Sequence, residues 1–504
     1  MIIANHNLNA LNYKDAASEL SMPYTVLRRL LGIRPPLQIT TDQVAFFKVL
    51  QEEPFLGEAN GNRFIDPGAM CAFMASYRVH AGFNCMKKDN LILSRLAPRY
   101  WVDNQYLSSD TFKVKKMNGF MLDLLVPFML CATNTRHNLK SLQRYTGMKD
   151  LALPTSAMSA FWKQARSIFN YMESRFYIDP ESVSATDTRL REDRETGKSA
   201  FGLPRLRRIC LQSWMLQHNI WPAPMDEEKT EKPGYYTRCV PGIHYGVESY
   251  DVRSAYPTTA INLNLKLWGE IQEQGDFAAY QTFLRQERAA HPEISQFLKM
   301  LANASIGDLS FAGSAVRNPD LMSRIWNAFH ERMQEWAGEI GEGRIIYSYT
   351  DCVVGPFEEV PPLPGYEVAH KASLKWLAIY NINRTIARKD DRIILKHFDK
   401  PLKLPMFAAA DQAIKGMLLR EGPEILLQPI SLPPDFLKSL PPEATQQTII
   451  KDGPCHDPKY FKLWFSLRPG PNNVQIAPAE AKKLLSSYLK LYLLKPGVET
   501  HGPY

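Results

Sequence analysis

The stretch Tyr250-Asp251-Val252-Arg253-Ser254-Ala255-Tyr256-Pro257 decides how the rest of the chain is interpreted. It follows the alternating apolar and polar run from Val240 to Ser249, which predicts a strand that ends at Asp251. A second acid, Asp351, comes 100 positions later (351 minus 251), directly after the β-rich run from Gly343 to Thr350. Because another apolar run follows Asp351, the pattern predicts a hairpin with this acid between its strands.

Two carboxylates at strand ends are how a protein can hold paired Mg²⁺ ions, which prefer carboxylates, phosphates and water as ligands. Such a pair of ions can align the attacking and leaving oxygens of an in-line phosphoryl transfer. Either aspartate alone is more simply explained as a solvated or capping acid in a turn, because Asp favours turns for its own hydrogen bonds. The residues around the two acids favour the metal-binding interpretation.

Three motifs carry a resemblance to family B DNA polymerases. Asp251-x-x-Ser254-x-Tyr256-Pro257 resembles the first polymerase signature of that family, Asp-x-x-Ser-Leu-Tyr-Pro. The run from Lys299 to Gly307 (KMLANASIG) resembles the second signature, Lys-x-x-x-Asn-Ser-x-Tyr-Gly. Tyr347 to Cys352 (YSYTDC) resembles the third, Tyr-x-Asp-Thr-Asp-Ser, and all three occur in the family's order.

The resemblance implies an α+β multidomain fold with a polymerase right hand. In it, residues 226–262 and 308–400 form a palm with an antiparallel sheet, 263–307 small helical fingers, and 401–504 a helical thumb. An α/β accessory region, 51–225, precedes this hand. Residues 1–50 are expected to be helical; their pattern is similar to a helix-turn-helix, although a plain helical hairpin fits the same residues.

The accessory region resembles a proofreading exonuclease only in part. Asn118 to Asp123 looks like the family's second exonuclease element, and Asp179 lies near the place of the third. The first element, Asp-x-Glu, is missing, because the nearest acid, Asp66, lacks the glutamate. Two-metal hydrolysis needs the acidic cluster complete, so we expect no exonuclease activity here. An unrelated accessory domain is the alternative.

The resemblance also implies roles for the acids. Asp251 and Asp351 would be catalytic and would hold two Mg²⁺ ions, with Mn²⁺ as an alternative, and the backbone carbonyl of Val252 would complete one site. Tyr349 stands where the family usually has the first aspartate of its third signature. The retained Asp351 matches the second, which carries metal in relatives, so activity is expected to survive.

Nucleotide contacts are expected from two helices and the first signature. Lys299 and Asn303 lie four residues apart and therefore on one helical face, where a lysine could meet triphosphate oxygens. In relatives, the residue that corresponds to Tyr256 excludes a 2′-hydroxyl, so deoxynucleotides should be preferred. The full set of expected nucleotide-binding residues is Ser254, Tyr256, Arg285, Arg288, Lys299 and Asn303.

Further residues are weaker candidates for DNA contacts. Gly307 would permit close helix packing or approach to the template. Lys375 and Tyr380 lie near the place of a family Lys-x-Tyr, but at another spacing. Lys459 and Lys462 alternate with aromatic residues, a pattern that suits nucleic acid but also the core face of a strand.

Composition sets broad limits on these interpretations. The 504 residues carry a net charge of +8, which permits an anionic partner without identifying one. Apolar runs are too short for a membrane span, and the first residues lack a secretory signal. The 7 cysteines include no Cys-x-x-Cys pair. We therefore expect a cytoplasmic protein, in the host cell if it is viral, that works without a membrane.

The function that these observations favour is a template-directed DNA polymerase that adds dNTPs to a primer 3′-hydroxyl, without active 3′–5′ proofreading. Its partners would be primer-template DNA, dNTPs and replication accessory proteins. Two alternatives stay open. One is a polymerase-shaped DNA-binding protein whose altered third signature has abolished chemistry. The other is a primase or an RNA-copying enzyme on a related palm.

Overall fold

A computed structural model describes the chain in the following ranges: 41–105, 113–132, 137–148, 153–178, 180–184, 203–220, 236–311, 314, 316–396, 405–440, 446–448, 473–475, 478–494 and 500–501. The predicted N-terminal helices and the run around Lys459 and Lys462 lie outside these residues. The chain divides into two compact units. The first comprises Met1–Pro233 and Tyr256–Trp326, and the second Gly234–Ala255 and Asn327–Tyr504.

The first unit contains a five-stranded mixed sheet of order β3-β2-β1-β4-β7. β1 pairs antiparallel with β2 and parallel with β4, which in turn runs parallel to β7. The helical prediction for residues 1–50 is wrong at its end, because β1 occupies Val44–Gln51. The apolar and aromatic run there suits a central strand that is buried on both faces. The other strands are β2 Leu56–Ala59, β3 Asn62–Phe64, β4 Val79–Gly82 and β7 Phe120–Asp123.

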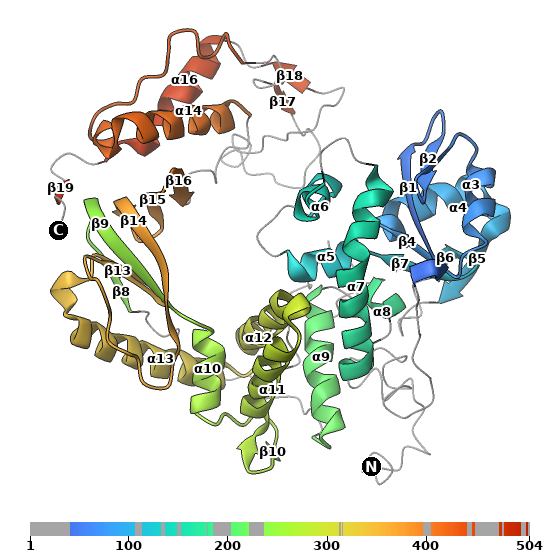
Figure 1. The fold of residues 1–504 in the computed structure, drawn as a ribbon, viewed down its shortest axis with the longest axis horizontal. Helices are drawn as coiled ribbons and strands as arrows, with labels where there is room; N and C mark the ends of the chain where they lie inside the picture. The colour runs from blue at the N-terminus through green and yellow to red at the C-terminus, as the bar shows by residue number, and fades with distance from the viewer. Residues whose placement is uncertain are drawn as a thin grey trace, which may run out of the picture. The chain divides into compact units, whose positions relative to one another are not determined.

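Helices pack against this sheet (Figure 1). The longest of them in the accessory region, α7 (Pro154–Phe176), places Trp162 against Phe46 of β1 with ring centroids 5.8 Å apart. A separate hairpin is formed by β5 (Trp101–Gln105) and β6 (Lys113–Met117). The remaining helices are α3 Pro67–Met74, α4 Asn90–Leu96, α5 Leu125–Cys131, α6 Leu139–Tyr145, α8 Pro180–Ser184 and α9 Leu203–Gln217.

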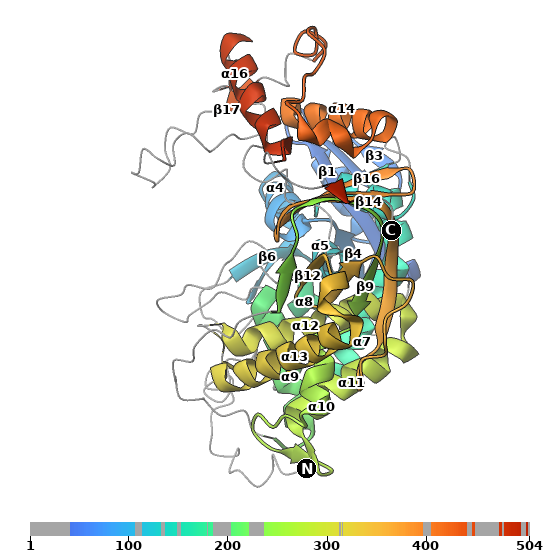
Figure 2. The same ribbon diagram turned by 90° about the vertical axis from the view of Figure 1, so that its left-hand side faces the viewer.

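Two neighbouring helices of the first unit, α11 (Asp276–Ala290) and α12 (Ser295–Ser310), occupy most of the segment 263–307, where small helical fingers are expected. Figure 2 shows them side by side. Only the 3-10 turn Pro292–Ile294 separates them in sequence. Before them come α10 (Ala255–Asn262) and the small hairpin of β10 (Glu270–Ile271) and β11 (Gln274–Gly275).

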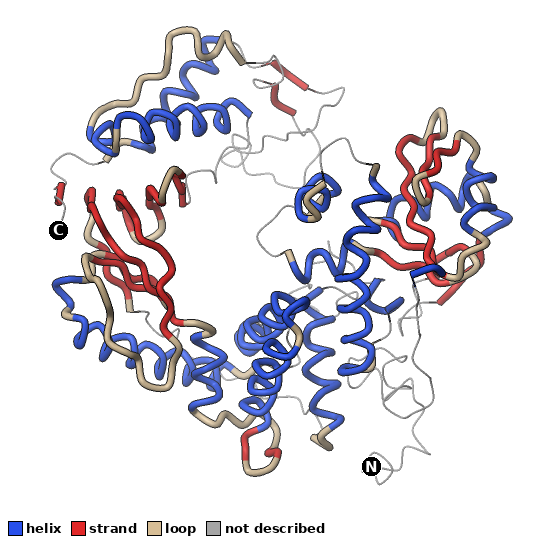
Figure 3. The backbone as a smooth tube through the Cα atoms, viewed as in Figure 1, coloured by secondary structure: helices blue, strands red, loops and turns tan. Residues whose placement is uncertain are grey.

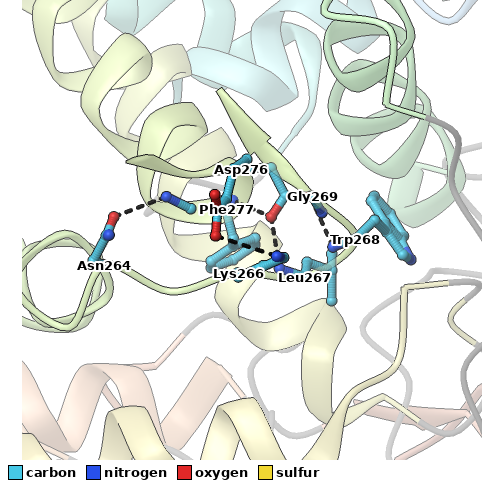
Figure 4. A network of polar contacts seen from close by, with 9 residues as sticks. Asn264, Lys266, Leu267, Trp268, Gly269, Asp276 and Phe277 are labelled. Atoms are coloured by element: carbon cyan, nitrogen blue, oxygen red, sulfur yellow. Dashed lines mark hydrogen bonds and ion pairs between the residues drawn. The ribbon is translucent and has the colours of Figure 1, made fainter. Parts of the chain in front are cut away.

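The carboxylate of Asp276, the first residue of α11, fastens the chain that leads into this helix (Figure 4). Its Oδ1 accepts from the backbone N–H groups of Leu267 (2.6 Å) and Phe277 (2.8 Å). Its Oδ2 accepts from those of Trp268 (2.8 Å) and Gly269 (2.9 Å). Burial raises the pKa of the Asp276 carboxyl, and the four N–H donors act in the opposite direction. One buried side chain therefore satisfies four backbone donors.

The second unit is built on an eight-stranded sheet with the order β16-β15-β14-β9-β13-β12-β8, to which the short strand β19 adds by pairing with β9. Apart from the parallel β19, all neighbouring strands are antiparallel. Figure 3 shows the strands in red. Their bounds are β8 Thr237–Cys239, β9 Gly242–Val252, β12 Tyr347–Tyr349, β13 Cys352–Gly355, β14 Val368–Asn381, β15 Arg384–Lys389, β16 Arg392–Lys396 and β19 Thr500–His501.

The strand predicted from Gly343 is shorter than expected. A 3-10 turn, Glu342–Arg344, follows Gly341, whose φ of +88° suits glycine. α13 (Pro319–Ile340) precedes this turn, and Trp336 on it donates to the carbonyl of Pro361 at 2.8 Å. The predicted C-terminal helices are present as α14 (Pro405–Glu421) and α16 (Pro478–Leu489). Short strands β17 (Gln446–Thr448) and β18 (Asn473–Gln475) pair with each other.

None of the helices within the described ranges combines the length and the apolar character that a membrane crossing requires.

Candidate active site

The central strands of the second unit bring Asp251 and Asp351 together. Asp251 is the penultimate residue of β9, and in the antiparallel pairing it lies opposite Cys352, the first residue of β13. Asp351 directly precedes Cys352 in the turn that joins β12 to β13. The backbone N–H of Val252 donates to the Asp351 carbonyl at 2.8 Å, which fixes the end of β9 to that turn. The two acids are therefore neighbours, although 100 positions separate them.

Each acid lies close to a residue whose backbone conformation is unusual for a residue with a side chain. Thr350 has a φ of +58° and Ser254 a φ of +49°, in the left-handed region. The Thr350 hydroxyl lies 2.8 Å from Asp351 Oδ1 and 2.7 Å from the Tyr349 carbonyl. Left-handed residues of this kind cost about 1–3 kcal/mol each and cluster at functional sites. The surrounding sheet therefore dictates where the carboxylates point.

The electrostatics of the pair favour a cation. Burial raises the pKa of the Asp351 carboxyl, and the negative charge of Asp251 raises it further. Asp251 Oδ1 is buried and has no hydrogen-bond partner among the described residues. The other oxygen, Oδ2, lies 3.1 Å from Lys371 Nζ. The charge and hydrogen bond of Asp251 raise the pKa of Lys371 although burial acts to lower it.

Lys371 is a site residue that sequence reasoning missed. It lies in β14 where the register against β9 shifts, with His370 opposite Tyr250 and Ala372 opposite Ser249. Lys371 is thus the extra residue of a β-bulge, a feature that redirects side chains. No sequence pattern indicated this bulge. The sequence instead indicates Lys375, as a weak DNA contact, because it lies near the place of a family Lys-x-Tyr.

Tyr349, which replaces an acid of the family pattern, meets a cation. Lys396 on β16 places its Nζ 5.3 Å from the centroid of the Tyr349 ring and 5.4 Å from that of Tyr347. Its Nζ also donates to the Tyr347 hydroxyl at 2.9 Å. A cation over an aromatic face is weakly stabilising. Tyr349 therefore belongs to a cluster of two aromatic rings and one lysine.

The described residues fit divalent cations that share their ligands with a substrate. Nowhere in these ranges do three or more His, Cys, Asp or Glu side chains gather where they could hold a metal ion. Mg²⁺ commonly takes only one or two protein carboxylates and completes its shell with water and phosphate oxygens. Asp251 with its unsatisfied oxygen and the neighbouring Asp351 suit that mode of binding.

The second motif lies in the first unit, where it forms an exposed stripe on α12. Lys299, Asn303 and Gly307 are all exposed, whereas Leu301, Ala302 and Ser305 between them are buried. On α11, Arg285 is exposed and Arg288 is half-buried. The i, i+4 spacing thus puts the lysine and the asparagine on one accessible face, as predicted.

Gly307 does not serve helix packing, which corrects one of its two expected roles. A Cβ built on this residue would meet no described atom within 4 Å. Close helix packing would require such a contact. Of the two expected roles of Gly307, only close approach to the template therefore remains.

Replacing Gly307 with alanine should therefore stabilise the protein while it impairs function. Alanine in an exposed helix should raise the free energy of unfolding by about 0.5–1 kcal/mol, because glycine has the lower helix propensity. If the stripe approaches nucleic acid, the added methyl should lower nucleotide incorporation. Urea unfolding and primer extension on the same preparation measure both effects. Gly338, which is also helical and also has no described atom within 4 Å of a built Cβ, is the matched control.

The other candidates have different surroundings. Tyr256 is the second residue of α10 and packs partly buried against the core of the first unit. Tyr380 donates its hydroxyl to the Tyr492 carbonyl at 2.5 Å, and burial raises its pKa. Lys375 is exposed, 3.8 Å from Asp391. Tyr380 therefore has a packing role, and Lys375 has only a loose surface ion pair.

The acids of the accessory region have structural partners. Asp123 Oδ1 accepts from the backbone N–H groups of Asn84 (2.7 Å) and Leu125 (2.9 Å). Asp66 caps α3 by accepting from Ala69 at 2.6 Å. Asp179 lies outside the described residues. The buried acid that faces β1 is neutralised by a lysine, since Asp89 Oδ2 lies 2.6 Å from Lys48 Nζ.

Comparison with known proteins finds a likeness in fold. No family model and no curated protein matches the sequence. The chain resembles the family B DNA polymerase from the hyperthermophilic archaeon Pyrobaculum calidifontis, with a TM-score of 0.50 and 16% sequence identity. The fold is polymerase-like. The match covers 77% of this chain and 63% of that polymerase, so this chain spans less than two thirds of its length.

Proposed function

We propose that this protein is a template-directed DNA polymerase of the family B type, which adds dNTPs to a primer 3′-hydroxyl. The observation that carries the proposal is that Asp251, near the end of β9, lies opposite Cys352, so that Asp351 in the preceding turn is its neighbour; one oxygen of Asp251 is unsatisfied. The three motifs in family order and the polymerase-like fold support it. Within it, residues 226–262 and 308–400 would form the palm, 263–307 with α11 and α12 the fingers, and 401–504 with α14 and α16 the thumb.

In this reaction, some of the named residues would bind metal ions and others would contact the triphosphate. Asp251, Asp351 and the carbonyl of Val252 would hold two Mg²⁺ ions, with Mn²⁺ as a substitute. When bound, such ions favour ionisation of the primer hydroxyl and offset charge on the leaving pyrophosphate. Lys299 would neutralise triphosphate oxygens as a point charge, and Arg285 and Arg288 would add contacts that can be bidentate.

Nucleotide selection is proposed to depend on Tyr256, whose ring would exclude a 2′-hydroxyl. Asn303 and Ser254 would orient the nucleotide by hydrogen bonds. The second signature here has Ala304 and Ile306 where the family has serine and tyrosine. Loss of that aromatic near the nascent pair leads us to expect reduced fidelity.

A primed DNA template with Mg²⁺ and dNTPs tests the proposal directly. We expect primer extension that depends on the divalent ion and stops on chelation, with dNTPs strongly preferred over rNTPs. Binding of the template without extension, with either Mg²⁺ or Mn²⁺, would instead favour a polymerase-shaped DNA-binding protein. Preference for rNTPs or for an RNA template would favour the primase or RNA-copying alternative.

Proofreading is expected to be absent. The structural hydrogen bonds of Asp123 and the lysine beside Asp89 leave the accessory region without an acidic cluster among its described residues. A 5′-labelled primer with a mismatched 3′ end should keep its length when incubated with Mg²⁺ in the absence of dNTPs. Metal-dependent shortening of that primer, retained in Asp251→Asn, would contradict this prediction.

A further inference from the structure

Lys371 is the cation that the sheet itself places beside the two carboxylates. Its Nζ lies 3.1 Å from Asp251 Oδ2, while Asp251 Oδ1 is buried without a described partner. Both side chains are partly accessible, with 57% of Lys371 and 28% of Asp251 exposed. Ion pairs of this exposure add little to stability, typically about 0–1 kcal/mol. The contribution of the Lys371–Asp251 ion pair to folding stability is therefore too small to explain its presence.

The backbone is shaped to bring this lysine to the acids. Neighbouring residues of a regular strand point to opposite faces. At the bulge, Lys371 reaches Asp251, and the next residue, Ala372, packs with the apolar cluster that includes Val247 and Leu374. Two consecutive residues thus serve the same face of the sheet, which a β-bulge allows and a regular strand does not.

The position of Lys371 conflicts with a bound metal ion. Asp251 and Asp351 repel each other, and an ammonium beside them relieves this repulsion at short range. A divalent ion relieves it better, because it carries twice the charge and takes carboxylate oxygens directly. Asp251 Oδ2, however, is the atom that Lys371 contacts. The lysine and the ion therefore compete for the same negative charge.

We propose that Lys371 is a built-in counter-ion that holds Asp251 before metal binds and leaves it when a divalent cation arrives. It thereby weakens binding of the ion to the free enzyme, so that the site fills well only when substrate phosphates add their oxygens. Lys371 is a positioning residue in this role. The proposal rests on the proposed function only in taking Asp251 and Asp351 as the metal-binding pair.

Binding of Mn²⁺ to the chain without DNA or nucleotide, followed by electron paramagnetic resonance, tests this role apart from activity. Lys371→Met should bind Mn²⁺ about three- to tenfold more tightly than the unmodified protein at low salt, because a nearby positive charge is removed. The gain should shrink in about 0.5 M NaCl through screening. Lys371→Arg should stay close to the unmodified protein.

Lys438→Met is the matched control. Lys438 Nζ lies 3.1 Å from Asp435 Oδ1, the same distance, but this pair is 83% and 78% exposed and stands apart from the acids of the site. Its removal should leave Mn²⁺ affinity unchanged. Lys371→Gln provides a second neutral variant should the methionine impair folding, which circular dichroism would reveal.

An affinity that is unchanged or weaker in a folded Lys371→Met or Lys371→Gln protein would overturn the counter-ion role. This outcome is separable from failure of the proposed function. Normal primer extension with unchanged Mn²⁺ affinity would refute the role of Lys371 alone. Tighter Mn²⁺ binding in the neutral variants without any primer extension would support the role and refute the polymerase.

Discussion

Asp251→Asn should lower primer extension by on the order of a thousandfold or more, and Asp351→Asn should do the same, because each removes an anionic metal ligand where charge develops in phosphoryl transfer. Each substitution should also affect the remaining acid, because the two carboxylates interact electrostatically. Asp251 lies on β9 opposite Cys352, which directly follows Asp351 in the chain, and the pKa of Asp351 is raised by burial and by the charge of Asp251. Among the described residues, no third carboxylate joins Asp251 and Asp351 that could take over the role of the one removed. Single-turnover nucleotide incorporation on a primed template measures the loss.

Asp391→Asn is the control for these variants. Asp391 is an acid of the same unit with 92% of its side chain exposed, and it makes only long ion pairs, 3.8 Å to Lys375 and 3.9 Å to Arg388. Its neutralisation should change incorporation by less than about twofold, given the small worth of exposed pairs. Undiminished incorporation in Asp251→Asn or Asp351→Asn, with the fold intact, would remove the basis of the proposed function.

Asp276→Ala should lower the free energy of unfolding by about 4 kcal/mol or more, because four backbone donors lose their common acceptor and each buried unsatisfied group costs about 1–3 kcal/mol. The donors belong to Leu267, Trp268, Gly269 and Phe277, and the aspartate is fully buried (Figure 4). Urea unfolding followed by tryptophan fluorescence should report the loss, and Trp268 lies within the affected turn.

A comparison with Asp320 separates this network from a simple charge effect at a helix start. Asp320 lies in the first turn of α13, as Asp276 does in α11, but it is exposed. Asp320→Ala should therefore cost only about 0.3–1 kcal/mol, the usual size of a helix-dipole interaction. Equal losses in the two variants would show that the four hydrogen bonds of Asp276 contribute no more than its charge does.

Local sequence patterns determined several elements correctly. Alternation predicted the strand that ends near Asp251, and the spacing of Lys299 and Asn303 predicted a shared helical face, which α12 provides. The patterns failed where tertiary pairing overrode them. The segment Val44–Gln51 belongs to a strand whose partners lie both nearby and farther along the chain, so its local surroundings did not identify it. Thr350 and Ser254 adopt a left-handed backbone that their residue types do not indicate.

The sequence by itself determined which acids and which helix face were candidates, because residue type and spacing are local properties. Asp251, Asp351, Lys299 and Asn303 were all identified in that way. Only the tertiary structure decided what surrounds the acids. Lys371 reaches Asp251 through a bulge, and Lys396 covers Tyr349 from a strand 47 residues further along (396 minus 349). Strand register sets these contacts, and register depends on pairing across the whole sheet.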